Sequence, residues 1–434
     1  MRRIYMDANA TTPLLPEVLD AMCPFWIENF GNASSIHQQG QHARAAVEHA
    51  REQVAALLRS RPSEIVFTSG GTESDNLALF GVLQPYLQSG EPAHLITTQI
   101  EHHAVLHAAE ALRDRGIEVT FLPCTAHGLI EPASLEAAIK PHTKLVSIML
   151  ANNETGVIQP IAELAAIAHA HGALFHTDAV QAAGKLPLDT SKSGHFANVD
   201  LLSISGHKIY APQGTGILFT RRSVRLSPLF FGGSHERQRR PGTENVPGIV
   251  ALGKAAELAQ HWLTSNTATN AGAPSSIAAS SRSKVGIEQS KTAPAETPSS
   301  LEALTQLRDH LEQTLLTTIE ESGVNGFGLP RVANTSNLYF DHVEAEALVI
   351  ALDLKGLSVS GGSACQSGAT EPSHVLTAMG LSPARARASI RFSLTRLTTA
   401  EEVDAALAII PAAVARLRDL SPTWRKADPA LAAH

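Results

Sequence analysis

Residues 200–210 read DLLSISGHKIY, an apolar strand pattern that runs into a serine, a glycine, a histidine and a lysine. A lysine just past a strand, among small and polar residues, can lose part of its hydration, which favours the neutral amine that forms a Schiff base. Lys208 is therefore the candidate reactive centre. The alternative is an ordinary surface lysine in a turn, so the assignment depends on whether other stretches point to the same position.

Strand-like and helix-like segments alternate on both sides of this stretch. The strand-like runs are residues 64–68, 94–98, 118–122, 144–150, 174–178, 200–205 and 216–220, and amphipathic segments cover 42–58, 104–115, 132–139 and 161–171. This alternation predicts crossover connections and a mainly parallel sheet, hence an α/β fold. In such sheets ligands bind at the carboxyl ends of the strands, where the loops carrying His102, Asn152, Asn153 and Glu154 would emerge.

Composition excludes several classes of protein. The 434 residues are 44% hydrophobic, enough for a large core and for two or three domains. A net charge of -7 with scattered basic residues argues against a nucleic-acid partner, and no apolar run approaches the ~20 residues that span a bilayer. The start, MRRIYMDANATTP, has no secretory apolar segment, and the three cysteines form no C-x-x-C pair. We therefore expect a cytoplasmic protein with a small substrate.

Two further stretches carry groups that suit a ligand with both an anionic and a cationic group. EIVFT (64–68) leads into SGGTE (69–73), and a strand followed by glycines at a helix start can cradle phosphate, although an ordinary helix N-cap is an equally good interpretation. Asp178 ends an apolar strand, LFHTD, where its burial requires a cation or a hydrogen-bond donor. A protonated pyridine nitrogen would meet that need, and Asp178 and Lys208 can lie at the same sheet edge.

The C-terminal half adds an insertion, a thiol and an arginine. Residues 264–300 are mostly Ala, Ser, Thr, Gly and Pro without apolar periodicity, which predicts a flexible insertion between helices. Beyond it, helices are predicted at 301–319, 344–354 and 400–417, and strands at 335–340 and 389–393. Cys365 lies in the small-residue loop SVSGGSACQSGA (358–369), which favours an accessible thiol. Arg391, inside the apolar SIRFS strand, needs an anionic partner such as a substrate carboxylate.

Taken together, these stretches resemble the cysteine desulfurases, pyridoxal phosphate enzymes of the class V aminotransferase group with fold type I. The resemblance covers almost the whole chain. It rests on ten stretches in order: DANATTP, FGNASSIH, EIVFTSGGTESDN, EHHAV, SIMLANNETG, HTDAVQ, SISGHKIY, RPGTENVPGIVALG, GGSACQSG and SIRFSL. RPGTENV and the long loop around Cys365 are similar to the nitrogen-fixation and iron-sulfur branch of the family.

The resemblance implies a role for each candidate residue. Lys208 would bind the cofactor covalently, Asp178 would pair with its pyridine nitrogen, His102 would stack on its ring, and Gln181 would bond its phenolic oxygen. The phosphate would be held by a set of small or polar residues: Gly71, Thr72, Ser205, His207 and, from the neighbouring subunit of a homodimer, Thr243. Asn153, beside the cofactor, would orient the amino acid together with Asn32 and Arg391.

The implied reaction converts L-cysteine to L-alanine and leaves a persulfide on Cys365, which would supply iron-sulfur scaffolds or other acceptors and act as a transient iron-sulfur ligand. The implied domains are a large cofactor-binding domain (15–260), the insertion (264–300) and a small domain (1–14 plus 301–434) with the cysteine loop. A class V aminotransferase, a selenocysteine lyase and a non-catalytic sulfur-transfer scaffold are the alternatives. The chain departs from the family pattern at Gly71, Ala211, Gln213 and Gly361, none of which removes a catalytic group.

Overall fold

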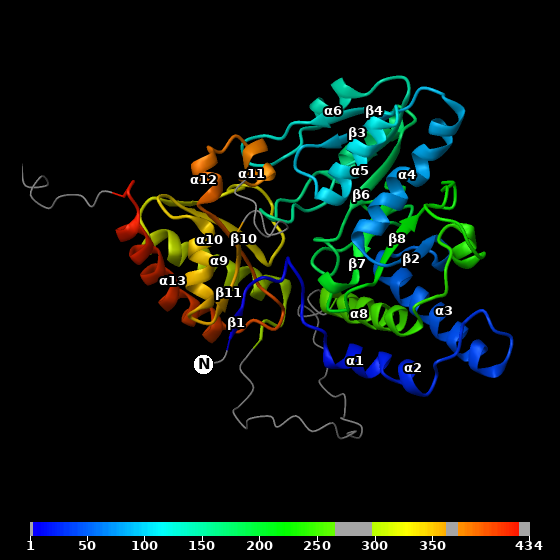
Figure 1. Cartoon of the computed structure of the whole chain (residues 1–434), viewed down its shortest axis with the longest axis horizontal. Helices are drawn as coiled ribbons and strands as arrows, with labels where there is room; N and C mark the ends of the chain where they lie inside the picture. The colour runs from blue at the N-terminus through cyan, green and yellow to red at the C-terminus, as the bar shows by residue number, and fades with distance from the viewer. Residues whose placement is uncertain (1–2, 265–296, 362–371, 425–434) are drawn as a thin grey trace, which may run out of the picture.

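The computed structural model describes residues 3–264, 297–361 and 372–424. Figure 1 shows two groups of elements, one around a large sheet and one around a smaller sheet, with the N-terminal segment running between them. No helix in these ranges is long and apolar enough to cross a membrane.

The large sheet has seven strands in the order β2-β8-β7-β6-β5-β3-β4. Its strands are β2 (Ile65–Thr68), β3 (His94–Thr98), β4 (Glu118–Leu122), β5 (Thr143–Ser147), β6 (Leu174–Asp178), β7 (Leu201–Ser205) and β8 (Gly216–Thr220). All pair in parallel except β8, which is antiparallel to both of its neighbours. The prediction of a mainly parallel sheet is confirmed.

Helices cover both faces of this sheet, because successive strand residues point to opposite sides. In β7, Leu201 packs with α4 (Gly71–Ser89) and α5 (His103–Asp114), whereas Leu202 faces the opposite core. The helices on that other side and at its rim are α1 (Pro16–Met22), α2 (Pro24–Ile27), α3 (Gln38–Leu58), α6 (Pro132–Ala138), α7 (Ile161–Ala170) and α8 (Val246–Thr264). α8 is not among the helices that periodicity predicts. α8 packs on both α3 and α1, so its residues are buried on several sides. The helix therefore lacks the broad polar face that makes an amphipathic helix recognisable in the sequence.

The smaller part is built on a four-stranded antiparallel sheet in the order β12-β13-β10-β9. Its strands are β9 (Ser322–Val324), β10 (Thr335–Phe340), β12 (Ser360–Gly361) and β13 (Ser389–Ser393). Its helices are α9 (Leu301–Thr318), α10 (Ala345–Asp353), α11 (His374–Ala378), α12 (Pro383–Arg387) and α13 (Ala400–Leu420). The N-terminal β1 (Ile4–Tyr5) joins this part by pairing in parallel with β11 (Leu357–Ser358).

Residues 7–12 connect the two parts through backbone hydrogen bonds. The Ala8 N–H donates to the Ser393 carbonyl at 2.9 Å, and the Thr12 N–H donates to the His207 carbonyl at 2.9 Å. We propose that the two parts are domains with the boundaries predicted from the sequence, and the separate apolar core that joins Met6 to α9, α10 and α13 supports this division. Val375 of α11, however, packs into the core of the large sheet.

The segment that contains the predicted insertion connects α8 to α9. Thr264 is the last residue of α8, and the Ser300 hydroxyl caps α9 by accepting from the Ala303 N–H at 2.8 Å. Trp262 and Leu301 line the same cavity, so the two helix ends are close together. The rest of the insertion, residues 265–296, lies outside the described ranges.

Replacing residues 265–296 with a short flexible linker is expected to leave stability and turnover nearly unchanged. Loop-closure entropy changes by only about 0.6 kcal/mol per doubling of loop length, and the ends of α8 and α9 already lie near each other. Urea unfolding and steady-state turnover of the deletion variant measure this. A variant that unfolds, or that loses turnover while folded, would show that the segment packs against the protein or contributes to the site.

Candidate active site

The candidate residues gather at the carboxyl edge of the large sheet. Asp178 is the last residue of β6, and β7, its neighbour, ends at Ser205, from where a 3₁₀ turn (Gly206–Lys208) carries the lysine. His102 follows β3, and Asn153 follows β5. These positions agree with the sheet-edge placement predicted from the sequence.

Lys208 is fixed by the backbone around it. Its Nζ donates to the carbonyls of Asn9 (2.5 Å) and Ala10 (2.6 Å), which belong to the N-terminal connection. Two residues earlier, a Cβ on Gly206 would lie 2.2 Å from the Thr215 Oγ1, so only glycine allows the turn to pack this closely. The connection and the turn together hold the amine at the junction of the two parts.

Asp178 is buried directly beside this turn. One of its carboxylate oxygens accepts a hydrogen bond from the Val180 N–H at 2.8 Å. Burial raises the pKa of Asp178 to about 6, opposed by that hydrogen bond and by the positive charge of Lys208. A protonated ring nitrogen bound next to this carboxylate would return its pKa toward the usual range, which is the charge balance that pyridoxal phosphate requires.

His102 begins α5 and is locked in one tautomer. Its Nδ1 accepts from the Ala104 N–H at 3.1 Å, which leaves the ring proton on Nε2. Burial, and then the nearby charge of Lys208, lower the pKa of His102 to about 4. The His102 imidazole is therefore neutral near pH 7, because burial disfavours its charged form. A neutral ring remains suited to stacking on an aromatic cofactor.

Three of the predicted phosphate residues, Gly71, Thr72 and Ser205, meet where α4 begins. A Cβ on Gly71 would lie 2.9 Å from Val180 Cγ2 and 3.6 Å from Ser205 Cβ. Val180 therefore crowds the place where a side chain at position 71 would begin, and Thr72 follows in the first turn of α4. The His207 Nδ1 lies 3.1 Å from the Thr11 Oγ1, and burial lowers the pKa of His207 to about 4. Free N–H groups at the start of this long helix favour an anion here.

Two unpaired polar atoms lie where the smaller part meets the large-sheet part, one on Arg391 and one on Asn153. Arg391 donates to the Asn153 carbonyl at 3.0 Å and forms an ion pair with Asp7 at 2.9 Å. The Arg391 Nε and the Asn153 Oδ1 are buried, and neither has a hydrogen-bond partner among the residues that the structure describes. Because unpaired buried polar atoms are costly, an open donor and an open acceptor on two residues that contact each other fit a polar ligand such as an amino acid. Asp7 was not predicted as a site residue, since only the tertiary structure places it against Arg391.

Asn32 and Thr243 are not brought to this edge within one chain. Both line a separate cavity of about 580 Å³, which contains none of the other described candidates. The loop carrying Thr243 is anchored there by a buried ion pair between Glu236 and Arg51 (2.8 Å). The structure therefore separates these two residues from Lys208 in the single chain.

Cys365 lies outside the described residues. The iron-sulfur ligand role predicted for this residue therefore stays a prediction. The residues on either side of its segment are placed at the junction. Gly361 pairs with Ile390, next to Arg391, and the His374 Nε2 lies 2.9 Å from the Glu101 carbonyl. In the described ranges no group of three or more His, Cys, Asp or Glu residues could hold a metal ion.

Glu101 is a buried carboxyl that the sequence patterns did not single out. Its Oε1 accepts from the Thr98 hydroxyl (2.8 Å) and from the Met149 N–H (3.0 Å), while its Oε2 has no partner in the described part of the chain. Burial raises the pKa of Glu101 from 4.5 to about 8, so the folded protein holds a proton there that the unfolded chain releases. The contribution of this carboxyl to the free energy of unfolding is therefore fully present below pH 4.5, and it is lost as the pH rises toward 8.

Glu101→Gln is expected to flatten this pH dependence. The amide keeps the accepting oxygen, has no charge to desolvate, and supplies a donor where the carboxylate has an unpaired oxygen. Between pH 4.5 and pH 8, the free energy of unfolding should fall by less in the variant, by on the order of 2 kcal/mol. Urea unfolding at both pH values measures the difference, with Glu110→Gln on the exposed face of α5 as the control. Parallel curves for wild type and Glu101→Gln would contradict the assignment.

Comparison with known protein sequences places the chain among named relatives. The aminotransferase class-V family matches residues 4–279 and 292–406. A cysteine desulfurase from Trichormus azollae is 46% identical over 422 residues, which cover 97% of this chain and 95% of the relative. The cysteine desulfurase IscS of Methanosarcina thermophila is 44% identical over 425 residues, which cover 98% and 95%.

Solved structures agree with the sequence relatives. A NifS-like protein is 34% identical with a TM-score of 0.80, covering 95% of this chain and all of that protein. SspA in complex with cysteine is 35% identical with a TM-score of 0.72, covering 90% and 98%. These matches confirm the predicted fold type I architecture, a large mainly parallel sheet combined with a smaller α/β part. The chain belongs to the aminotransferase class-V family and, within it, to the cysteine desulfurases.

Proposed function

We propose that this protein is a homodimeric, pyridoxal phosphate-dependent cysteine desulfurase that converts L-cysteine to L-alanine and carries the sulfur as a persulfide on Cys365. One observation carries the proposal: Lys208, Asp178 and His102 converge at the carboxyl edge of the large sheet. The Lys208 charge lowers the pKa of both Asp178 and His102, although burial has the larger effect on each. Three groups that suit one cofactor therefore lie within electrostatic reach of one another.

The described residues fit that cofactor in three respects. Asp178 offers a buried carboxylate to a cationic ring nitrogen, the start of α4 at Gly71 offers N–H groups to a phosphate, and Gln181 lies next to Lys208 through the shared Asn9 carbonyl. When bound, pyridoxal phosphate supplies the electron sink that makes cleavage of a carbon–sulfur bond possible. The protein's part is to fix the orientation and charge of the bound groups.

Substrate binding falls to the side of the site that belongs to the smaller part. The Arg391 guanidinium would receive the amino-acid carboxylate, and its unpaired Nε is the donor available for this contact. Asp7 keeps Arg391 in place and partly neutralises it, so the cation is held without losing that donor. Asn153, bonded to Arg391 through its carbonyl, would orient the substrate from the large-sheet side.

Cys365 would accept the sulfur atom. Its thiolate would attack the substrate sulfur, forming an S–S bond while the bond between that sulfur and the substrate carbon breaks. The electron pair of the broken bond would stay with the carbon, which takes up a proton to become the methyl group of alanine. A persulfide would remain on Cys365 for transfer to an iron-sulfur scaffold or another acceptor protein. A transient iron-sulfur ligand role would follow from the same persulfide. The described anchors of its segment, Gly361 beside β13 and His374 against the Glu101 carbonyl, support this role because both lie at the site. A cytoplasmic location fits with the free thiols of Cys23 and Cys124.

The assay of purified protein with L-cysteine tests the function directly. Sulfide, measured with a thiol reductant present, and alanine should be released in equal amounts. Selenocysteine tested in parallel distinguishes a selenocysteine lyase, which would prefer that substrate. Release of neither product by protein with a full complement of cofactor would overturn the proposal.

A second copy of the chain would complete the site. Asn32 and Thr243 line a cavity apart from Lys208, and the segments around them carry exposed apolar side chains: Ile36 and Phe231 are each 91% exposed. Exposed apolar groups of this kind are typical of protein interfaces. The homodimer would bring Thr243 to the partner's phosphate and Asn32 to the partner's substrate.

Ile36→Asp is expected to shift the protein from dimer to monomer and to lower its cofactor content, because a charge placed in an apolar interface must be desolvated. Sedimentation measures the mass, and absorbance measures bound cofactor. The control is Leu354→Asp, which changes an equally aliphatic side chain that is 81% exposed at the end of α10. A variant that keeps the wild-type dimer mass would place the interface elsewhere.

A further inference from the structure

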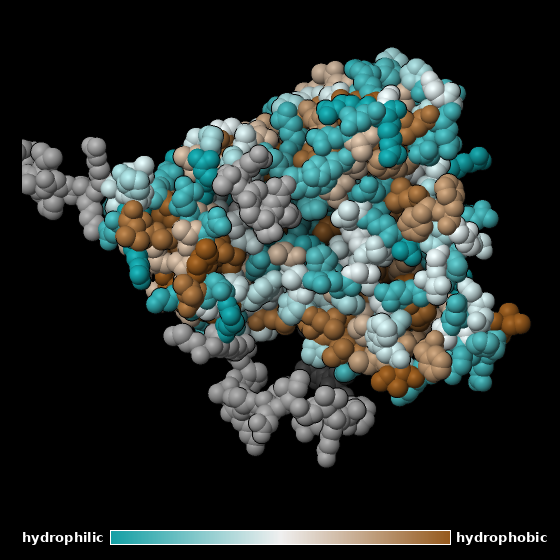
Figure 2. All heavy atoms as spheres, viewed as in Figure 1, coloured by the Kyte–Doolittle hydropathy of each residue, from teal (hydrophilic) through white to brown (hydrophobic). Residues whose placement is uncertain are grey.

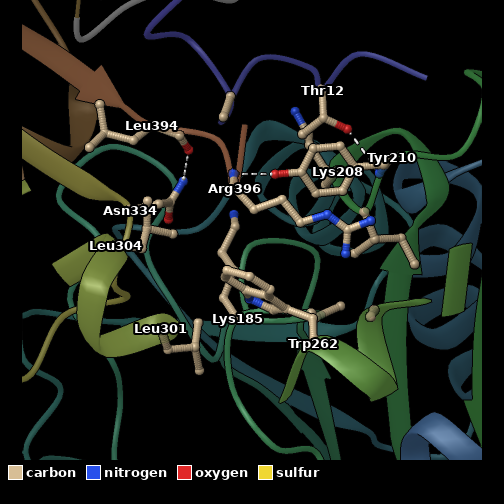
Figure 3. Close-up of a pocket in the computed structure, with 15 residues that line it drawn as sticks. Thr12, Lys185, Lys208, Tyr210, Trp262, Leu301, Leu304, Asn334, Leu394 and Arg396 are labelled. Atoms are coloured by element: carbon tan, nitrogen blue, oxygen red, sulfur yellow. Dashed lines mark hydrogen bonds between the residues drawn. The ribbon is translucent and has the colours of Figure 1, made fainter. Parts of the chain in front are cut away.

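Lys185 is a second lysine at the site, and the roles proposed above do not use it. It lies seven residues beyond the end of β6, and its Nζ donates to the Gln181 Oε1 at 2.9 Å. Lys185 and Lys208 line one cavity of about 30 Å³, which has room for a single water molecule. Figure 3 shows the Lys185 side chain reaching into this cavity, with Trp262 and Asn334 on its walls.

The contact with Lys185 fixes which way the Gln181 amide points. A lysine ammonium can only donate hydrogen bonds, so the amide oxygen must face Lys185 and the NH₂ group must face away. The NH₂ group accordingly donates to the Asn9 carbonyl at 3.0 Å, and the same carbonyl accepts from the Lys208 Nζ at 2.5 Å. Lys185, Gln181, Asn9 and Lys208 therefore form one continuous chain of hydrogen bonds.

We propose that Lys185 is a positioning residue that holds the Gln181 amide with its NH₂ group toward Lys208, so that a phenolic oxygen bound there receives a donor and not a carbonyl. This inference rests on the proposed function, which places pyridoxal phosphate at Lys208. A flipped amide would set its oxygen against the negatively charged phenolic oxygen, a repulsive contact. Lys185 acts through Gln181 and has no direct contact with the reacting atoms in this assignment.

The surroundings of Lys185 are strongly cationic. Burial, followed by the charges of Lys208 and Arg391, lowers the pKa of Lys185 to about 7, and Arg396 and Tyr210 also line the cavity. Below that pH the group is an ammonium, for which the oxygen of Gln181 is the accepting partner seen in the structure. The amide orientation is therefore enforced most strictly on the acidic side of neutrality.

Lys185→Met tests the inference through the visible absorbance of the lysine-bound cofactor. A hydrogen bond donated to the phenolic oxygen favours its negative form and lowers the pH at which the cofactor–lysine linkage loses its proton. Without Lys185 the midpoint of the absorbance change should rise by about one pH unit, the size of effect that a single hydrogen bond produces. The control is Lys254→Met, which removes a lysine that pairs with Glu257 on α8, and its midpoint should equal that of wild type.

Gln181→Leu provides a second test of the same inference. This variant should raise the midpoint in the same direction, and Lys185→Met added to it should cause no further shift, because both act through one amide. An unchanged absorbance midpoint in Lys185→Met would overturn the inference, and so would midpoint shifts of the two single variants that add in full in the double variant. Lys185→Leu repeats the test if the methionine variant does not fold. Failure of the proposed function would look different: wild-type protein would show no cofactor attached to Lys208 at all.

Discussion

Lys208→Ala is expected to lose the visible absorbance of the lysine-bound cofactor and to lower kcat for cysteine by about a thousandfold or more. The Lys208 Nζ is held at the sheet edge by the Asn9 and Ala10 carbonyls, beside the buried Asp178. Alanine leaves Asp178 and the start of α4 in place, so the cofactor can still bind without a covalent link. Absorbance spectra and steady-state kinetics of the purified variant measure both effects.

The nearby Lys185 provides a sharp control for this experiment. Its amine, with a pKa lowered to about 7 mainly by burial, is also a plausible nucleophile by its protonation state alone. Borohydride reduction of the wild-type protein, followed by peptide mapping, should place the cofactor on the peptide that contains Lys208. An adduct on Lys185, or a Lys208→Ala variant that keeps the wild-type spectrum, would show that the wrong lysine was assigned.

Cys365→Ala is expected to release almost no sulfide or alanine, a fall of about a hundredfold or more, because the nucleophile of a covalent step is removed. Binding of cofactor and substrate should persist, since Lys208, Asp178 and Arg391 are unchanged. Spectral titration with L-cysteine should therefore still show a substrate-dependent change in the variant. A free thiol of pKa ~8.5 is mostly protonated at neutral pH, so turnover in wild type should rise with pH as the thiolate forms.

Mass spectrometry completes the test of Cys365. Wild-type protein treated with L-cysteine should gain one sulfur atom on the peptide that contains Cys365. Cys124→Ala is the matched control: burial raises the pKa of this partly buried thiol, which makes it a poor nucleophile. The desulfurase mechanism fails if the sulfur is found on Cys23 or Cys124, or if Cys365→Ala turns over cysteine at the wild-type rate.

The alternation of strand and helix patterns correctly predicted most elements of the fold. A strand buried on both faces, or a helix with one apolar side, has a local pattern of apolar residues that can be recognised in the sequence. β3 (His94–Thr98) and β6 (Leu174–Asp178) have the predicted bounds. α8 shows no such pattern, since it is buried between α1 and α3 and its apolar residues occupy several sides of the helix. The strand order was also not predictable, because it depends on contacts between distant segments.

The same distinction applies to the site. By itself the sequence determined that Asp178 ends a strand, that the Lys208 turn follows one, and that the chain is a class V relative, because motifs at strand ends are local. Only the tertiary structure decided that Asp7 pairs with Arg391, that Lys185 orients Gln181, and that Asn32 lies apart with Thr243. It also decided that the pKa of His102 is about 4. Ion pairing and desolvation depend on which distant residues surround a group, and local sequence does not specify those neighbours.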